Sequence, residues 1–305
     1  MPPLRAALNA RGVPYAEHFT EGGTLDIAAK PPVGVFLNRM SPSSHTRGHQ
    51  GGVHYAAALF PWLEAAGVRV INGSNAFAFE VSKVKQHTAL QAAGILTPHT
   101  LAVVGVEGMR EAARQLTPPF ITKHNQGGKG LGVQLYRTHE ALDAALDAGA
   151  YESSPDSINL LQQYIEPPEP FITRVEIVDG VFQYAIRSST EAGFLLCPAD
   201  ACAIDDAFCP VGEDADTMSA DGDPRFSLAA DIGADDPLVL AYIKLMKAHH
   251  IDVAGIEFVT DAEGRRYTYD INGTTNFNSG VEARHGKDGM GAIAELCHRA
   301  LQALT

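Results

Sequence analysis

A glycine-rich stretch at residues 121–133, ITKHNQGGKGLGV, constrains the fold of this chain more than any other segment. Glycine recurs at every second position over Gly128–Gly132, so the backbone can fold closely over phosphate oxygens. Lys123 before the loop and Lys129 within it add positive charge. The stretch therefore predicts a flexible loop that covers phosphate groups.

A second polar signature lies more than a hundred residues later, where YDIN at 269–272 ends a predicted strand. Side chains at i and i+2 of a strand share a face, so Asp270 and Asn272 can both reach one divalent cation. A phosphate-covering loop in one half of the chain and oxygen donors in the other are typical of an enzyme that closes on a metal-bound nucleotide.

The length and composition fit a globular protein. The chain has 305 residues, 45% of them hydrophobic, which allows one large domain or two to three small ones. No apolar run approaches the roughly 18–20 residues of a membrane span, and MPPLRAALNARG lacks the apolar segment of a secretory signal. We therefore expect a cytoplasmic protein without a membrane partner.

The negative charge is concentrated in one segment. Of the net charge of −13, nine acids and no Lys or Arg lie between Ser188 and Pro224, which leaves −4 elsewhere. This distribution argues against a nucleic-acid partner. Three of the four cysteines fall in the same segment without a C-x-x-C pair, so ordinary thiols are favoured over a metal or redox role.

Hydrophobic periodicity predicts alternating strands and helices, and therefore an α/β chain. Asp179–Gly180 lies between two alternating runs and predicts a hairpin turn, and Pro61 is expected to kink or split its helix. The predicted strands are 33–37, 68–71, 120–123, 133–136, 159–165, RVEIV, VFQYAIR, 254–260 and 266–271. The predicted helices are about 53–66, 82–94, a segment after 107, 139–148, 235–250 and 288–304.

The order of features over about residues 70–285 resembles the ATP-grasp superfamily, especially the branch of glutathione synthetase and the ribosomal-protein glutamate ligases. No one motif is specific, but five occur in the expected order. They are Lys83 followed by GILTPHT, Lys123 before the glycine loop, QQYI at 162–165, Glu257 in AGIEF, and Asp270 with Asn272.

The resemblance implies an α/β ATP-grasp fold, in which an N-terminal pre-ATP-grasp α/β lobe precedes two α+β lobes that sandwich the nucleotide. The expected domains are 1–98, on the substrate side, 99–165, with the glycine-rich loop, and 166–305, with the metal site.

The resemblance also implies an ATP site and a metal site. The family often has an acid where this chain has Gln163, and it more often has Asp first and Glu second in the metal set, the reverse of the order here. The implied nucleotide-binding residues are Lys83, Lys123, Gly127, Gly128, Lys129, Gly130, Gln162, Gln163, Tyr164 and Ile165. The implied ligands of one or two Mg²⁺ ions, with Mn²⁺ as a substitute, are Glu257, Asp270 and Asn272.

Two arginines are candidate catalytic residues. Arg187 matches a family arginine near the transferring phosphoryl group, where it would stabilise developing charge, and Arg174 begins the preceding strand. The family usually has an Asp two residues before the arginine that corresponds to Arg174, and this chain has Ile172 at that position.

The loop 38–50 follows a buried strand, at the position where open α/β sheets bind ligands. Its cationic side chains suit a carboxylate substrate, although a polar structural loop is the alternative, and HTRGH lacks the glutamate of a catalytic zinc site. The candidate substrate residues are Arg39, His45, Arg47, His49 and, after the metal strand, Asn276.

The favoured reaction is ATP-dependent ligation of a carboxylate to an amine through an acylphosphate, with release of ADP and phosphate. A kinase-like phosphotransferase and a nucleotide-binding regulatory module without turnover are the alternatives. The expected partners are a small carboxylate and an amine, either an amino acid or a peptide, and a homo-oligomer is compatible with the sequence. The sequence does not identify the acid or the amine.

Overall fold

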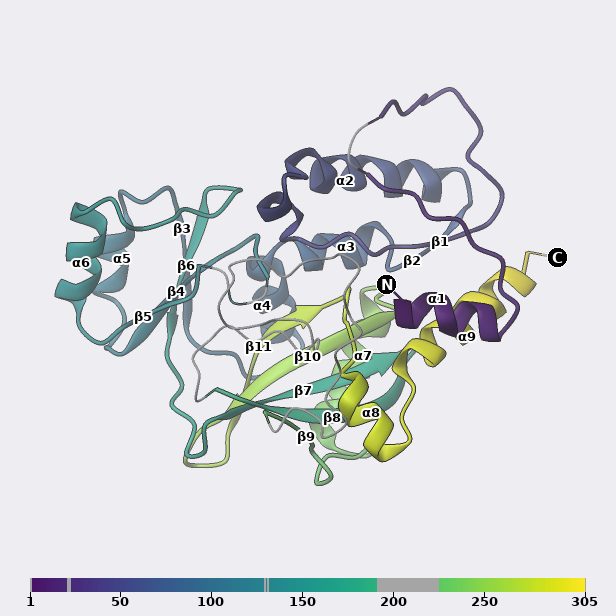
Figure 1. Cartoon of the computed structure of the whole chain (residues 1–305). Coiled ribbons are helices and arrows are strands. Elements are labelled where there is room, and N and C mark those ends of the chain that lie inside the picture. Colours follow the sequence, from purple (N-terminus) through teal and green to yellow (C-terminus); the bar gives the residue numbers. More distant parts are fainter. Residues whose placement is uncertain (1, 21–22, 129, 131, 191–224, 305) are drawn as a thin grey trace.

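The computed structural model describes residues 2–20, 23–128, 130, 132–190 and 225–304. Residues 191–224, which carry the nine acids and the three cysteines of the acidic segment, lie outside these residues, as does Lys129. The described part has three lobes, and Figure 1 shows the central lobe at one side, the N-terminal lobe above and the C-terminal sheet below. No helix among the described residues is long and apolar enough to cross a membrane.

The N-terminal lobe contains a two-stranded parallel sheet, β1–β2, covered by α2. Helix α2 runs through Pro61 without a break, so the expected split does not occur. The elements are α1 Pro2–Ala10, β1 Val35–Leu37, the 3₁₀ helix η1 Ser44–Arg47, α2 Gln50–Ala65, β2 Arg69–Ile71, α3 Ser74–Glu80 and α4 Lys83–Ala92.

The central lobe is a four-stranded antiparallel sheet in the order β3-β6-β4-β5, with two helices packed on one face. Its core includes Phe120 from the sheet and Leu142 from α6, both fully buried. The elements are β3 Thr100–Val104, α5 Met109–Ala113, β4 Phe120–His124, β5 Gln134–Tyr136, α6 His139–Asp147 and β6 Ile158–Gln163.

The C-terminal lobe is a five-stranded antiparallel sheet in the order β11-β10-β7-β8-β9. Helix α7 covers one face, and α9, which pairs with α1 from the other end of the chain, covers part of the opposite face (Figure 1). The elements are β7 Phe171–Val178, β8 Val181–Ser189, β9 Phe226–Leu228, α7 Pro237–Ala248, β10 Val253–Thr260, β11 Arg266–Asn272, α8 Ser279–His285 and α9 Gly289–Gln302.

Most predicted elements are present, because turn and capping residues marked their ends. The Ser82 hydroxyl accepts from the Lys85 N–H and caps α4, at the start of the helix predicted over about 82–94. Asp179 and Gly180 both have positive φ, as a tight hairpin turn requires. The elements without a clear signal in the sequence were α1, α3, α8, β3 and β9, most of which are short. The boundaries between the predicted domains stay a prediction.

Candidate nucleotide and metal site

A cavity of about 1680 Å³ lies where the three lobes meet. The lobes contribute the loop after β1, the glycine-rich loop, β6 and one face of the C-terminal sheet. Ligand pockets usually measure about 300–1,000 Å³, so this cavity has room for a nucleotide and a second molecule.

A row of charged side chains crosses the cavity face of the C-terminal sheet. The register places Arg174 of β7 opposite Glu257 of β10, and Glu257 opposite Asp270 of β11. Residues directly opposite each other in an antiparallel sheet project from the same face. The structure thus brings together three residues that are separated by up to 96 positions in the chain.

A β-bulge aims Asp270 at this face. Glu257 pairs with Asp270 but Phe258 pairs with Thr268, which leaves Tyr269 as the extra residue on β11. Thr268 faces α7 on the other side of the sheet, where its hydroxyl contacts a buried tyrosine. Without the bulge, alternation would place Asp270 on the α7 side with Thr268, so the bulge creates the site.

Arg174 is buried at the centre of a network of hydrogen bonds. Its guanidinium donates to Glu176 Oε1 at 2.7 Å, to Glu257 Oε1 at 2.9 Å and to Thr275 Oγ1 at 2.6 Å. The guanidinium lies over Gly255, where an added Cβ would be 2.3 Å from Nη2. Burial opposes the charge, but the two carboxylates more than offset it and raise the pKa of Arg174.

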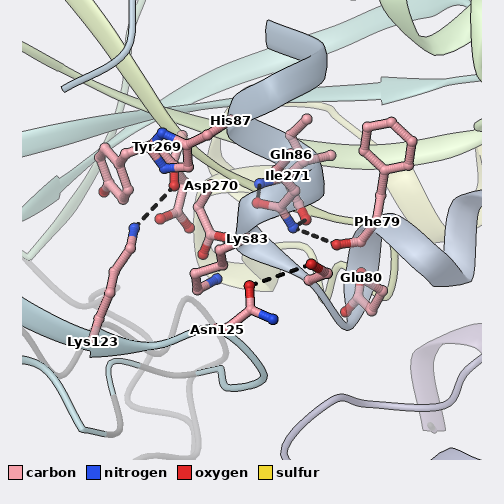
Figure 2. Close-up of polar contacts among 12 residues, drawn as sticks. Phe79, Glu80, Lys83, Gln86, His87, Lys123, Asn125, Tyr269, Asp270 and Ile271 are labelled. Atoms are coloured by element: carbon pink, nitrogen blue, oxygen red, sulfur yellow. Dashed lines mark hydrogen bonds and ion pairs between the residues drawn. The ribbon is translucent and has the colours of Figure 1, made fainter. Parts of the chain in front are cut away.

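Lys83 begins helix α4 and donates its ammonium to Asp270 across the lobe boundary (Figure 2). Asn125, just after β4, fixes the start of this helix. Its carbonyl oxygen accepts from the Lys83 N–H at 3.2 Å and its Oδ1 accepts from the Val84 N–H at 2.9 Å. One residue therefore joins the central lobe to the helix that presents the first lysine.

Lys123 approaches the same strand from the central lobe. Its ammonium donates to the Tyr269 carbonyl oxygen at 3.2 Å and lies 5.5 Å from the centre of the Tyr269 ring (Figure 2). Burial and the nearby Lys83 charge lower the pKa of Lys123 to about 7. A cation that is destabilised in this way favours an anionic ligand.

The two carboxylates of the row have shifted pKa values in opposite directions. Burial and the Asp270 charge raise the pKa of Glu257, against the opposing effect of Arg174. Burial also acts on Asp270, but Lys83 and Lys123 outweigh it and lower the pKa of Asp270. Asp270 therefore stays ionised, whereas Glu257 is held beside a like charge.

These carboxylates fit a hard divalent cation. Two negative side chains directly opposite each other in a buried sheet repel, and a cation between them would relieve that repulsion. Asn272 follows Asp270 at i+2 on the same face and adds an amide oxygen, so the donors are all oxygens, as Mg²⁺ prefers. Within the described residues no three His, Cys, Asp or Glu side chains converge, so the set depends on this amide.

The glycine-rich loop borders the cavity beside the N-terminal lobe. Gly130 and Gly132 have φ near +75°, and a Cβ on Gly132 would be 2.5 Å from His124 Nε2, so a side chain there would clash. His124 contacts the Glu152 carbonyl oxygen at 2.8 Å and is thereby fixed. The loop glycines that line the cavity are Gly127, Gly128 and Gly130.

The segment 162–165, whose residues are among the predicted nucleotide-binding residues, also lines the cavity. The Gln162 side chain donates to Thr100 Oγ1 at 2.8 Å, and the backbone N–H groups of Gln163 and Tyr164 donate to protein carbonyl oxygens at 2.8 and 3.3 Å. These three groups are already hydrogen-bonded within the protein. The prediction that this segment binds the nucleotide therefore depends on its other backbone groups.

Arg187 does not join the other predicted site residues. It lies opposite Thr173 on the α7 side of the sheet and does not line the cavity. Its guanidinium forms an ion pair with Asp231 at 2.7 Å and lies 4.9 Å from the Phe171 ring centre. Its position does not support the predicted role near a transferring phosphoryl group.

A second β-bulge explains this position. Phe182 pairs with Ile177 and Tyr184 pairs with Glu176, which leaves Gln183 as an extra residue on β8. Beyond that point the alternation is reversed relative to β7, so Arg187 turns away from the cavity.

The loop after β1 does contribute to the cavity. Arg39 spans the lobes, because it donates to the Thr275 carbonyl oxygen at 3.0 Å and to Asn276 Oδ1 at 2.6 Å. The side chain of His45 lies outside the described residues. The predicted substrate residues that line the cavity are Arg39, Arg47, His49 and Asn276.

Sequence reasoning missed two buried residues of this site, Glu80 and Glu176. Glu80 ends α3 and accepts from the Gly273 N–H and from Thr274 Oγ1, which holds the loop after β11. Glu176 and Thr275 complete the Arg174 network. Glu176 had a usable signal, because it follows Arg174 at i+2 and shares its face. Glu80 had none, because its partners lie almost 200 residues away.

Comparison with known proteins identifies the fold. No family model matches the chain. A probable alpha-L-glutamate ligase from Aeromonas salmonicida is 23% identical over 242 residues, which is 79% of this chain and 72% of that protein. An ATP-grasp RimK domain protein from Sphaerobacter thermophilus has a TM-score of 0.67 at 18% identity, covering 96% of this chain and 93% of its own. The ATP-grasp ligase PsnB, complexed with a phosphomimetic variant of its minimal precursor, Mg and ADP, has a TM-score of 0.64 at 16% identity, covering 98% and 94%.

Proposed function

We propose that this chain, which has the ATP-grasp fold, is an ATP-dependent ligase that joins a carboxylate to an amine. The reaction has two steps. A substrate carboxylate oxygen attacks the γ-phosphorus of ATP, giving an acylphosphate and ADP. The amine nitrogen then attacks the acyl carbon and loses a proton, the bond from that carbon to the phosphate oxygen breaks, and an amide and inorganic phosphate are released.

The observation that carries this proposal is the convergence of two buried lysines, the buried Glu257 and the partly buried Asp270 on one cavity. Lys83 and Lys123 come from different lobes and both contact β11 within two residues, at Asp270 and Tyr269. A binding protein for an uncharged ligand has no use for four ionisable groups that are largely withdrawn from water, because their desolvation is costly. A metal-bound polyphosphate would compensate all four.

The chain's own residues act by positioning and by electrostatic stabilisation. Lys83 and Lys123 would bind phosphate oxygens as point charges, and the N–H groups of the glycine-rich loop would cover the phosphates and exclude water. We assign the role near the phosphoryl group to Arg174 rather than to Arg187, because Arg174 lies opposite Glu257 on the cavity side of the sheet and Arg187 lies opposite Thr173 on the α7 side. No covalent nucleophile of the protein is required.

Mg²⁺ would be held by Glu257, Asp270 and Asn272, and when bound it would neutralise phosphate charge. Mn²⁺, which is also served by oxygen donors, would substitute for it. Lys83 donates to Asp270, and Arg174 donates to Glu176 as well as to Glu257, so Arg174 has a carboxylate partner outside the proposed metal set.

The proposal is tested by ADP release with panels of acids and amines, added singly and in pairs, with mass spectrometry of the products. A ligase gives ADP release that depends on both components, and a product mass equal to their sum minus water. ADP release with an acid alone, accompanied by a stable phosphorylated product, would instead identify a phosphotransferase. Nucleotide binding without ADP release under any combination would indicate a regulatory module.

Matched variants separate the site from the fold. Lys123→Ala and Asp270→Asn should each reduce turnover by at least a hundredfold, because each removes a charge that faces the nucleotide. Arg187→Ala serves as the control, because its ion pair lies on the other face of the sheet. Full activity of either site variant would refute the assignment.

A further inference from the structure

The cavity continues past the nucleotide-binding residues into the N-terminal part of the molecule, where apolar side chains of three helices line it beside the Arg5–Glu17 ion pair. We call this part the apolar chamber and define it by Leu4 and Leu8 of α1, Leu59 of α2, and Cys297 and Leu301 of α9. None of these side chains carries a charge. The chamber therefore has the wrong chemistry for a phosphate or a sugar.

Helix periodicity builds the chamber. Leu4 and Leu8, and Cys297 and Leu301, are i,i+4 pairs and so lie on one face of their helices. On α2, Leu59 and Leu63 form a third such pair that also lines the cavity. Three helices from opposite ends of the chain thus turn apolar stripes toward one space.

Arg39 lies between the chamber and the nucleotide-binding half. Two of its nitrogens donate to Thr275 O and Asn276 Oδ1, while its Nε is buried and has no hydrogen-bond partner among the described residues. Thr275 in turn accepts from Arg174 of the charged row. A carboxylate bound at Arg39 would therefore lie beside the residues assigned to the phosphates.

The acids that line the cavity are already engaged. Glu17, at the chamber, accepts two hydrogen bonds from Arg5 at 2.5 and 2.7 Å. Glu80 accepts from Gly273 N–H and Thr274, and the remaining two acids are the proposed metal ligands Glu257 and Asp270. Among the described residues, no cavity carboxylate is free to bind an ammonium group.

From these features we infer that the acid substrate is a monocarboxylate with an extended apolar body and without an α-ammonium group. Its carboxylate would bind at Arg39, and its apolar body would lie between α1, α2 and α9. The statement that this ligand is the acid that becomes phosphorylated rests on the proposed ligase function. The amine would enter from the nucleotide-binding half.

Binding of straight-chain monocarboxylates from acetate to octanoate, measured by isothermal titration calorimetry with Mg·ADP present, tests the inference without turnover. Each buried methylene should lower Kd by about fourfold until the chamber is filled. The α-amino acid of the same chain length should bind at least about tenfold more weakly, because its ammonium finds no partner. A Kd that does not change with chain length, or tighter binding of the amino acid, would overturn the inference.

Two substitutions at the chamber wall test its location. Leu301→Phe, in the last turn of α9, should shorten the best-binding chain by about one or two methylenes, while Ala58→Leu, on the exposed side of α2, should not change it. If Leu301→Phe does not fold, Cys297→Leu provides the same test on the same face of α9. An unchanged chain-length profile in the folded wall variant would refute the chamber as the binding site.

Substitution of Arg39 tests the carboxylate anchor. Arg39→Gln should weaken all chain lengths by about 10- to 100-fold, and Arg39→Lys should recover most of that loss because it keeps the charge. If Arg39 only ties down the 275–276 loop, both variants should behave alike, which would contradict the inference.

The two proposals can fail separately. If binding depends on chain length but ADP release does not depend on an amine, the proposed chamber is supported and the proposed ligase function is refuted. If amine-dependent ADP release occurs with short polar acids, with no preference for apolar acids, the ligase function is supported and the chamber is refuted.

Discussion

Gly255→Ala is the substitution whose consequence follows most directly from the geometry. An added Cβ would lie 2.3 Å from Arg174 Nη2, 2.4 Å from Nε and 2.6 Å from Cζ. Real Cβ atoms do not approach other atoms this closely, so the guanidinium must move. Its hydrogen bonds to Glu176, Glu257 and Thr275 would then be lost together.

The expected loss of stability is large for a single methyl group. Glu176 has no exposed side-chain surface and Glu257 is 12% exposed, so both would become buried carboxylates without their arginine. Removal of one partner of a buried pair costs about 3–5 kcal/mol. We expect a decrease of this size in the unfolding free energy of the C-terminal lobe, and loss of ADP release.

Urea unfolding monitored by circular dichroism provides the measurement, with Gly51→Ala as the matched control. Gly51 lies near the start of α2, where an added Cβ meets nothing within 4 Å, so the same change should stabilise by about 0.4–1 kcal/mol. In an Arg174→Met background Gly255→Ala should cost much less, because its effect acts through the guanidinium. A Gly255→Ala variant within about 0.5 kcal/mol of wild type, or costs that simply add in the double variant, would refute the reasoning.

Three further predictions concern the lysines and their supports. Folding lowers the pKa of Lys123 from 10.5 to about 7, so the unfolded chain binds the Lys123 proton more tightly than the folded chain does. The free energy of unfolding should therefore rise between pH 7 and 10.5. Lys123→Met should flatten this pH dependence, as measured by urea unfolding at a series of pH values. Asn125→Ala removes the side-chain acceptor at the start of α4, so it should lower the free energy of unfolding by about 1–2 kcal/mol in the same assay and raise the KM for ATP. An unchanged KM would show that Lys83 does not need this support. Arg187→Ala should change stability by at most about 1 kcal/mol and leave kcat within threefold, because its ion pair is exposed; a hundredfold loss of kcat would restore the role first predicted for it.

The sequence predicted most elements and part of the site, because local signals carried them. Ser82 as a cap placed Lys83 at the start of a helix, and the i, i+2 spacing placed Asp270 and Asn272 on one face. The ATP-grasp fold itself was predicted from five motifs in order and is confirmed by the structural neighbours.

The remainder depended on features that periodicity does not carry. The bulges at Gln183 and Tyr269 each insert one residue and reverse the face on which the following side chains lie. Without its bulge the hairpin would turn Arg187 toward the cavity face of the sheet, whereas the bulge turns it toward α7. The contact of Glu80 with the loop after β11 arises only from the packing of two lobes, and no local pattern indicates it.

The most direct test of the central claim, that residues of separate lobes form one metal–nucleotide site, is the Mg²⁺ dependence of nucleotide affinity. Binding of a non-hydrolysable ATP analogue would be measured by calorimetry with and without Mg²⁺. In the wild type Mg²⁺ should strengthen binding, Asp270→Asn should lose that gain, and Lys123→Ala should bind more weakly with or without the ion. An Asp270→Asn variant that keeps the full Mg²⁺ effect would contradict the claim.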